Sequence, residues 1–233
     1  IFLGTSNAKL DNIDVHHNEA VDGGGLDISY SSTVPVLNNL KVRYNKSANS
    51  GGGIYILGAS PKINNALITH NFSQYYTSAI SNENFSNLLL TNSVVANNTI
   101  EFPYWGSTIR NNDTRSSIKM INCVVVGNNG GVALLENGAG DFKIHNSLVV
   151  GNQHPLTGTF DIKHSIVQGK AAEPENGNPD GNIDINILFN DYLNGDYTLK
   201  NDAASRTMAT NPAINAGNNS LYDFTIYGIL DTS

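Results

Sequence analysis

The sequence of 233 residues contains very little cysteine and few charged side chains. Cys123 is the only cysteine, so no internal disulfide framework can hold the chain together. Charged residues make up only 14% of the chain, so neutral polar groups must hydrate most of its surface. The 13 basic residues are outnumbered by 20 acidic ones, and the net charge of −7 argues against nucleic acid or an anionic membrane as a partner.

Long apolar runs are also missing. No run of apolar residues is long enough to cross a bilayer, so we expect no transmembrane segment. A signal peptide is not recognisable either, because Ile1-Phe2-Leu3-Gly4 is typical of the middle of a strand. We therefore expect the natural start of the protein to lie upstream of Ile1.

Asparagine and glycine are abundant instead. The chain has 35 asparagines and 22 glycines, the residues that best tolerate left-handed backbone and tight bends. Together with 39% hydrophobic residues, this composition predicts a chain that bends often and regularly around a core.

A frame of nine residues recurs along the chain and predicts a repeat architecture. Its pattern is apolar-x-Asn-x-x-apolar-x-x-Asn, and the leading asparagines follow one another at intervals of 24 to 30 residues. The copies are LDNIDVHHN at 10–18, LNNLKVRYN at 37–45, INNALITHN at 63–71, LTNSVVANN at 90–98, MINCVVVGN at 120–128 and IHNSLVVGN at 144–152. A seventh copy at 162–170 has lost both asparagines, as expected near the end of a solenoid.

Apolar residues at fixed offsets from the leading asparagine define two strands in each repeat. The residues two and four positions before it alternate as in a half-buried strand. The residue three positions after it is apolar as well, so the chain must turn at the asparagine to keep all three inside. A third strand follows the glycine-rich segments at 23–28 and 51–56, with an echo at 130–132.

Three short strands and three bends per coil predict an all-β fold. We expect a right-handed, single-stranded parallel β-helix of about seven coils over residues 1–170, since the leucine spacing of a leucine-rich horseshoe is missing. Stacked coils lie about 4.8 Å apart, so the leading asparagines should form a structural ladder whose amides bond from coil to coil. Its members are Asn12, Asn39, Asn65, Asn92, Asn122 and Asn146.

These repeats resemble those of bacterial surface proteins. The segments GGGLDI and GGGIYI, each followed by hydrophobic-x-x-Asn elements, are similar to repeats of chlamydial polymorphic outer-membrane proteins and of β-helix surface proteins of the Bacteroidota. The segment at 182–217 resembles the end of choice-of-anchor Q-type β-helix proteins, although Asn211 and Asn215 stand where serine and aspartate are usual. The resemblance implies a parallel β-helix and a surface protein of a kind whose members are mostly non-enzymatic or uncharacterised.

No catalytic motif is evident in the chain. β-Helix enzymes need clustered carboxylates, with a nearby Arg or Lys where Ca²⁺ is used. On the most suitable outer face we expect a row of Asp27, Tyr55, Ser81, Arg110 and Ala133, which holds one carboxylate and one arginine about 14 Å apart. The row therefore indicates no catalytic residues.

The histidines do not predict a metal site. His16 and His17 are adjacent on an extended chain and should point to opposite faces. His17 and His70 lie two coils apart, too far to share a zinc ion, and should be surface side chains stacked with Tyr44 and Asn97. We expect neither a metal nor a cofactor.

Six aromatic residues stand in two loops of consecutive coils. They are Phe72, Tyr75, Tyr76, Phe102, Tyr104 and Trp105. Side by side, they could form a flat platform for a sugar ring or a protein partner. The alternative is that they pack over an edge of the solenoid.

An apolar row follows the ladder on the outer face of the second strand. It consists of Leu67, Val94, Val124, Leu148 and Ile166, with Val126 and Val150 beside them. A patch of this size needs a cover in a soluble monomer. The hypothesis is that the C-terminal segment 171–233 folds back over the helix and covers the row through residues 183–220.

Two classes of function remain open on this evidence. The first is a non-enzymatic secreted or cell-surface module, an adhesin-like scaffold that binds a glycan or a host or cell-surface protein. The second is a polysaccharide lyase or glycoside hydrolase of the β-helix type with an unrecognised site. In either case we expect an extracellular or outer-surface location on a bacterium.

Overall fold

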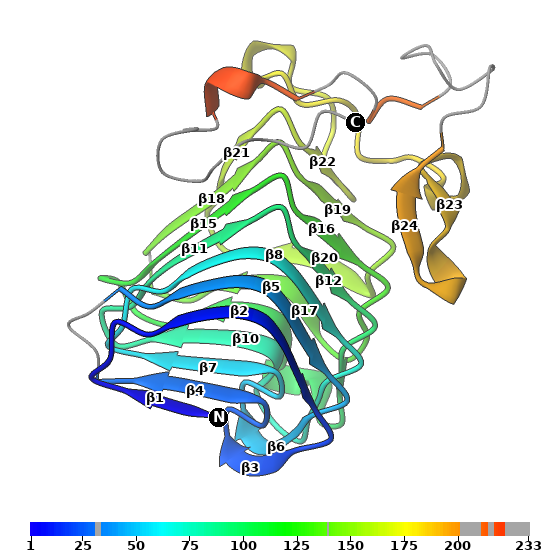
Figure 1. The fold of residues 1–233 in the computed structure, drawn as a ribbon. Helices are drawn as coiled ribbons and strands as arrows, with labels where there is room; N and C mark the ends of the chain where they lie inside the picture. The colour runs from blue at the N-terminus through cyan, green and yellow to red at the C-terminus, as the bar shows by residue number, and fades with distance from the viewer. Residues whose placement is uncertain (31–33, 139, 201–210, 214–216, 222–233) are drawn as a thin grey trace.

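The chain winds into a right-handed parallel β-solenoid of about six turns, close to the seven coils that the repeats predict (Figure 1). The computed structural model describes residues 1–30, 34–138, 140–200, 211–213 and 217–221. Each coil adds one strand to a 7-stranded parallel sheet. In spatial order its strands are β1 (Phe2–Gly4), β4 (Leu26–Ser29), β7 (Ile54–Leu57), β10 (Thr77–Glu83), β14 (Ser107–Asn111), β17 (Val132–Glu136) and β20 (His154–Thr157).

An 11-stranded sheet forms the two adjoining faces of the solenoid. Its first three strands bend at the corner without a break: β2 (Lys9–His16), β5 (Val36–Arg43) and β8 (Lys62–Thr69). Beyond them the sheet divides into two arms. One arm holds β11 (Asn87–Thr91), β15 (Ser117–Ile121), β18 (Asp141–His145) and β21 (Asp161–Lys163), and the other holds β12 (Val94–Ala96), β16 (Val124–Val126), β19 (Leu148–Val150) and β22 (Ile166–Val167).

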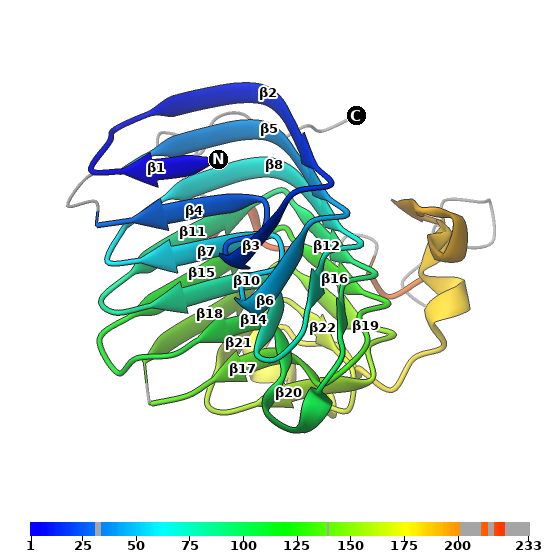
Figure 2. The same cartoon turned by 90° about the horizontal axis from the view of Figure 1, so that it is seen from below.

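A 4-stranded parallel sheet links these faces in the N-terminal coils. Its strands are β3 (Glu19–Asp22), β6 (Lys46–Ser50), β9 (Phe72–Ser73) and β13 (Thr99–Ile100). In Figure 2 equivalent strands lie stacked coil upon coil. No helix in the described part of the chain is both long and apolar enough to cross a membrane.

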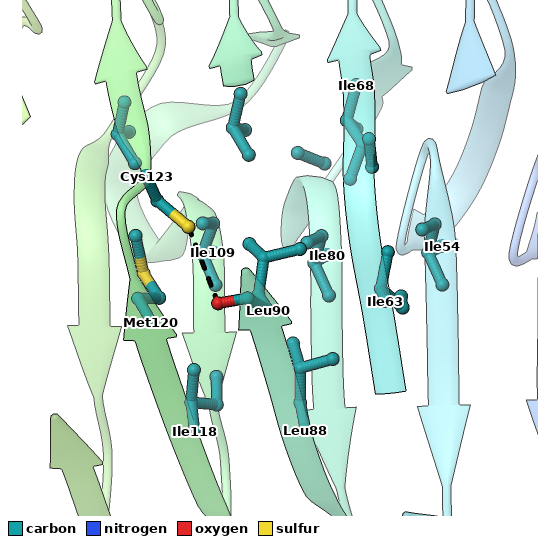
Figure 3. Close-up of a cluster of buried hydrophobic side chains, with 14 of the residues drawn as sticks. Ile54, Ile63, Ile68, Ile80, Leu88, Leu90, Ile109, Ile118, Met120 and Cys123 are labelled. Atoms are coloured by element: carbon teal, nitrogen blue, oxygen red, sulfur yellow. Dashed lines mark hydrogen bonds between the residues drawn. The ribbon is translucent and has the colours of Figure 1, made fainter. Parts of the chain in front are cut away.

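The core is filled by the residues that alternate along the strands. Leu37, Ile63, Leu90 and Met120 stand two positions before the leading asparagines, occupy matching positions in the parallel register, and are fully buried. Figure 3 shows Ile63, Leu90 and Met120 of this column. Beside them the Cys123 thiol donates to the carbonyl oxygen of Leu90 at 3.4 Å. The alternating pattern thus places these residues as the sequence predicts.

The leading asparagines mark the corner of the 11-stranded sheet. All six have left-handed backbone, with φ between 49° and 55°, which explains why asparagine recurs there. Their amides lie outside the core, however, and bond only in part to one another. Asn65 Nδ2 donates to Asn39 Oδ1 at 2.7 Å and Asn122 Nδ2 to Asn92 Oδ1 at 3.1 Å, whereas Asn39 donates to Asp11.

The buried amide ladder is formed by the trailing asparagines of the frame, which corrects the expected position of the ladder. They are Asn18, Asn45, Asn71, Asn98, Asn128 and Asn152, and each Nδ2 donates to the Oδ1 of the next at 2.9–3.0 Å. The five from Asn45 onward are buried. A second left-handed corner directly before each of them, at His17, Tyr44 or His70 for example, turns the amide inward.

Glycine in the third bend allows close contact between coils. A Cβ at Gly24 would overlap the carbonyl oxygen of Lys46, and one at Gly52 would overlap that of Phe72. The GGG segments therefore recur because backbone passes against backbone there.

The C-terminal segment after β22 is built from short 3₁₀ turns and one antiparallel hairpin. The turns are η2 (Pro174–Asn176), η3 (Ile185–Ile187), η4 (Tyr192–Asn194) and η5 (Asn219–Leu221), and the hairpin strands are β23 (Phe189–Asp191) and β24 (Asp196–Leu199). The hairpin stands beside the solenoid in Figures 1 and 2.

This segment contacts the outer apolar row of the solenoid. Leu188 and Phe189 are buried in one cluster with Val126, Val150 and Ile166. Val94, Val124 and Leu148 pack against that cluster, as do Ile183, Ile185, Tyr197, Leu199 and Ala213 of the C-terminal segment. Leu67 is not part of the cluster, and Ile214 lies outside the described residues. The apolar row from Val94 upward is therefore covered by the chain itself.

Candidate functional site

The aromatic loops meet where they lead into β10 and β14, two central strands of the 7-stranded sheet. Tyr75 stacks on Phe102 with ring centroids 5.3 Å apart and an interplanar angle of 21°. Tyr76 lies 6.4 Å from Tyr75 in a tilted arrangement. Tyr75 and Phe102 are each 46% exposed, so the stacked pair presents a surface to solvent.

The other three aromatic candidates occupy different surroundings. Tyr104, in η1 (Pro103–Trp105), is 93% exposed. Phe72 is half-buried in β9. The side chain of Trp105 lies outside the described part of the structure. Tyr75, Tyr76 and Phe102 therefore form the centre of the aromatic surface.

A hollow of about 300 Å³ adjoins this surface where the 4-stranded sheet meets the 7-stranded sheet. Tyr76 belongs to both the aromatic surface and the hollow. The lining residues come from three consecutive coils, and all are polar or aromatic. They are Asn49, Ser50, Tyr55, Tyr76, Glu83, Arg110 and Asn112.

A chain of hydrogen bonds orders one wall of the hollow. The Ser50 hydroxyl donates to Ser81 Oγ at 3.0 Å, and the Ser81 hydroxyl donates to Glu83 Oε1 at 2.7 Å. Asn49 Nδ2 donates to Asp22 Oδ1 at 2.9 Å, which holds that amide in place. The wall therefore presents amide and carboxylate groups in fixed orientations.

Arg110 supplies the positive charge of the hollow. Its Nη2 donates to Asn112 Oδ1 at 2.7 Å, and its guanidinium carbon lies 5.5 Å from the centroid of the Tyr76 ring, within cation–π range. Its Nε is buried and has no hydrogen-bond partner in the described structure. Burial lowers the pKa of Arg110, although the Glu83 carboxylate favours its charged form. The positive charge of the guanidinium at the lining of the hollow favours binding of a hydrogen-bond acceptor there.

Tyr55 lines the hollow as a protonated phenol. Burial raises the pKa of its hydroxyl, and the nearby Glu83, Asp22 and Asp27 carboxylates raise it further. The hydroxyl therefore keeps its proton and can donate a hydrogen bond.

The predicted outward row is only partly correct. Asp27, Tyr55, Ser81 and Arg110 do occupy matching positions, but Arg110 pairs with Leu135 rather than Ala133, which is buried. Left-handed Gly130 and Gly131 lie directly before β17 and shift the alternation there. Glu83 and Asn112 follow Ser81 and Arg110 by two residues and face outward too, a period-2 signal that could have revealed them.

The chain belongs to a family of right-handed parallel β-helix proteins. The family profile described as right-handed β-helix region matches residues 1–171, which is most of the chain. Comparisons with curated proteins and with solved structures gave no match.

Proposed function

We propose that this protein is a non-enzymatic scaffold of a bacterial surface that binds glycans through the hollow around Arg110 and the adjoining Tyr75–Phe102 pair. The observation that carries the proposal is the guanidinium of Arg110, which lies beside the Tyr76 ring and lines a hollow open to solvent. Sugars present hydroxyl or carboxylate acceptors at their edges and apolar C–H faces, so one ring could engage Arg110 while the next lies on the stacked pair.

The carboxylate content of the hollow favours binding over hydrolysis. Hydrolysis by a pair of carboxylates requires two such groups about 5–10 Å apart on either side of the bond. Among the lining residues only Glu83 carries a carboxylate, and its Oε1 accepts from Ser81. The Asp22 and Asp27 carboxylates near Tyr55 do not line the hollow, and each already accepts a hydrogen bond from a neighbouring side chain. The activity measurement described below tests the alternative that the protein is a lyase or hydrolase.

A glycan array screened with the full chain tests the proposal. We expect retention of a defined set of glycans, reduced at least tenfold by Arg110→Gln and by the double substitution Tyr75→Ala/Phe102→Ala. The matched control is Phe85→Asn, which removes an aromatic ring of similar exposure, 45%, that lies under Arg115. Equal retention by all variants would contradict the proposal.

An activity measurement on the retained glycans distinguishes binding alone from the lyase or hydrolase alternative. We expect no new reducing ends and no unsaturated products over hours of incubation. Turnover that disappears in Glu83→Gln would replace the binding proposal with an enzymatic function.

A further inference from the structure

His16 and His17 lie together on the outer surface of the first coil, far along the chain from the hollow. The expectation that these adjacent side chains point to opposite faces is wrong, because His17 has left-handed backbone with φ of 55°. The turn brings the two Nδ1 atoms to 3.0 Å from each other. The rings are nearly perpendicular, with an interplanar angle of 86°.

This separation matches the bite of a bidentate metal site. Two imidazole nitrogens 3.0 Å apart, each about 2.05 Å from a metal ion, subtend an angle of about 94° at that ion. A tetrahedral ion would require a separation of about 3.4 Å at the same bond length. The pair therefore suits the right-angled geometry of tetragonal Cu²⁺ or Ni²⁺ better than that of Zn²⁺.

The ring of His17 is held in place by its neighbours. It stacks on Tyr44 at 5.3 Å, and Tyr44 stacks on His70 at 4.9 Å. Both rings of the histidine pair are exposed to solvent, so an ion can reach them and keep water in its remaining positions. Asp14 is on the same strand, but its carboxylate is paired with Arg43 at 2.7 and 3.1 Å.

We propose that His16 and His17 chelate a divalent transition-metal ion of tetragonal preference, Cu²⁺ before Ni²⁺. No group of three or more His, Cys, Asp or Glu residues is placed to hold a metal among the described residues, so the protein supplies two ligands and water completes the site. Without metal, one Nδ1–H donates to the other Nδ1. On binding, that proton moves to Nε2 of its own ring, and both Nδ1 lone pairs face the ion.

Variants for the test can be taken from the repeat itself. Thr69 and Asn97 occupy the positions in later coils that are equivalent to His16 and His17. The substitutions His16→Thr and His17→Asn should therefore preserve the strand and the left-handed corner. The matched control is His70→Asn, which removes an imidazole from the same corner row but has no adjacent histidine. Equal circular dichroism spectra and melting temperatures verify that all three variants fold.

The experiment is titration of the full chain with Cu²⁺, Ni²⁺ and Zn²⁺ by calorimetry at pH 7.5, with electron paramagnetic resonance of the one-equivalent Cu²⁺ sample. We expect a tetragonal spectrum with coupling to two imidazole nitrogens, a Kd for Cu²⁺ at least tenfold higher in His16→Thr and His17→Asn, and a change below twofold in His70→Asn. Zn²⁺ should bind at least tenfold more weakly than Cu²⁺.

Three results would each overturn the proposal. The first is wild-type affinity for Cu²⁺ no tighter than that of His17→Asn. The second is an equal loss in His70→Asn, and the third is coupling to a single nitrogen. Glycan retention by His17→Asn is expected to equal that of the wild type, so this test is independent of the proposed function.

Discussion

The side-chain amide of Asn98 donates to Oδ1 of Asn128, 3.0 Å away in the next coil, and accepts from Asn71 at the same distance. Its Nδ2 also donates to the carbonyl oxygens of Ile68 and Ala96, and Oδ1 accepts from the backbone N–H of Asn71. One fully buried amide thus satisfies polar groups from three coils. Such an amide stabilises a solenoid interior only while all its bonds are made.

Asn98→Ala is expected to lower the free energy of unfolding by about 1–3 kcal/mol, because it removes the acceptor of the Asn71 backbone N–H and one hydrogen bond from each of the Asn71 and Asn128 amides inside the protein. Urea denaturation followed by circular dichroism measures the change. The control is Asn65→Gly at the outer corner, where glycine keeps the left-handed backbone and the amide is exposed, and its effect should stay within about 0.5 kcal/mol. Equal effects of the two substitutions would disprove the inner position of the trailing ladder.

The sequence predicts the strands and the stacking well because both depend on a period. Leu37, Ile63 and Leu90 recur at one offset and lie in one buried column. The choice between the two asparagine rows does not follow from the period, since both rows recur equally often. It depends on left-handed backbone at the residue before each trailing asparagine. Only the later coils have asparagine or glycine there, the residues that favour this conformation, whereas the first three coils have His17, Tyr44 and His70.

The candidate sites could be predicted from the sequence only where they depend on strand alternation. Tyr55 and Arg110 follow from strand alternation, whereas the 3.0 Å approach of His16 to His17 depends on one dihedral angle. The unpaired Nε of Arg110 depends on packing between coils, which no single repeat encodes.

Release of the C-terminal segment should expose the apolar row. Phe189→Asp places a charge among Val126, Val150 and Ile166, where burial of an unpaired carboxylate is strongly unfavourable. We expect the segment to detach and the protein to self-associate, measured by size-exclusion chromatography with light scattering. The control is Leu193→Asp on the exposed side of the same segment, 74% accessible to solvent, which should remain monomeric. A monomeric Phe189→Asp without increased binding of an apolar dye would contradict the covering role.

Trp105 distinguishes the platform from the packing interpretation of the aromatic loops. If it belongs to the platform, Trp105→Ala should abolish glycan retention and change the melting temperature by less than about 2 °C, as expected for an exposed side chain. Retention on a glycan array and a thermal melt are measured on the same sample. A fall of more than about 5 °C with retention intact would assign the residue to packing.

Acidification should destabilise the fold through His145. This side chain is buried, its Nδ1 has no partner among the described residues, and its Nε2 lies 3.3 Å from Asp161 Oδ2. Burial lowers the pKa of the imidazole, and it outweighs the opposite effect of the Asp161 carboxylate. The unfolded chain, with a histidine pKa of about 6.5, therefore binds a proton more readily than the folded one.

The stabilising contribution of neutral His145 is then fully present above about pH 6.5 and decreases as the pH falls from there through the lower pKa of the folded state. Urea denaturation at pH 7.5 and 5.5 measures this difference in the wild type and in His145→Thr, which carries the residue found at the matching position Thr91. The variant should lose less stability than the wild type between the two pH values. An identical loss would show that His145 is protonated equally in both states, and that the nearby Asp161 carboxylate offsets burial in full.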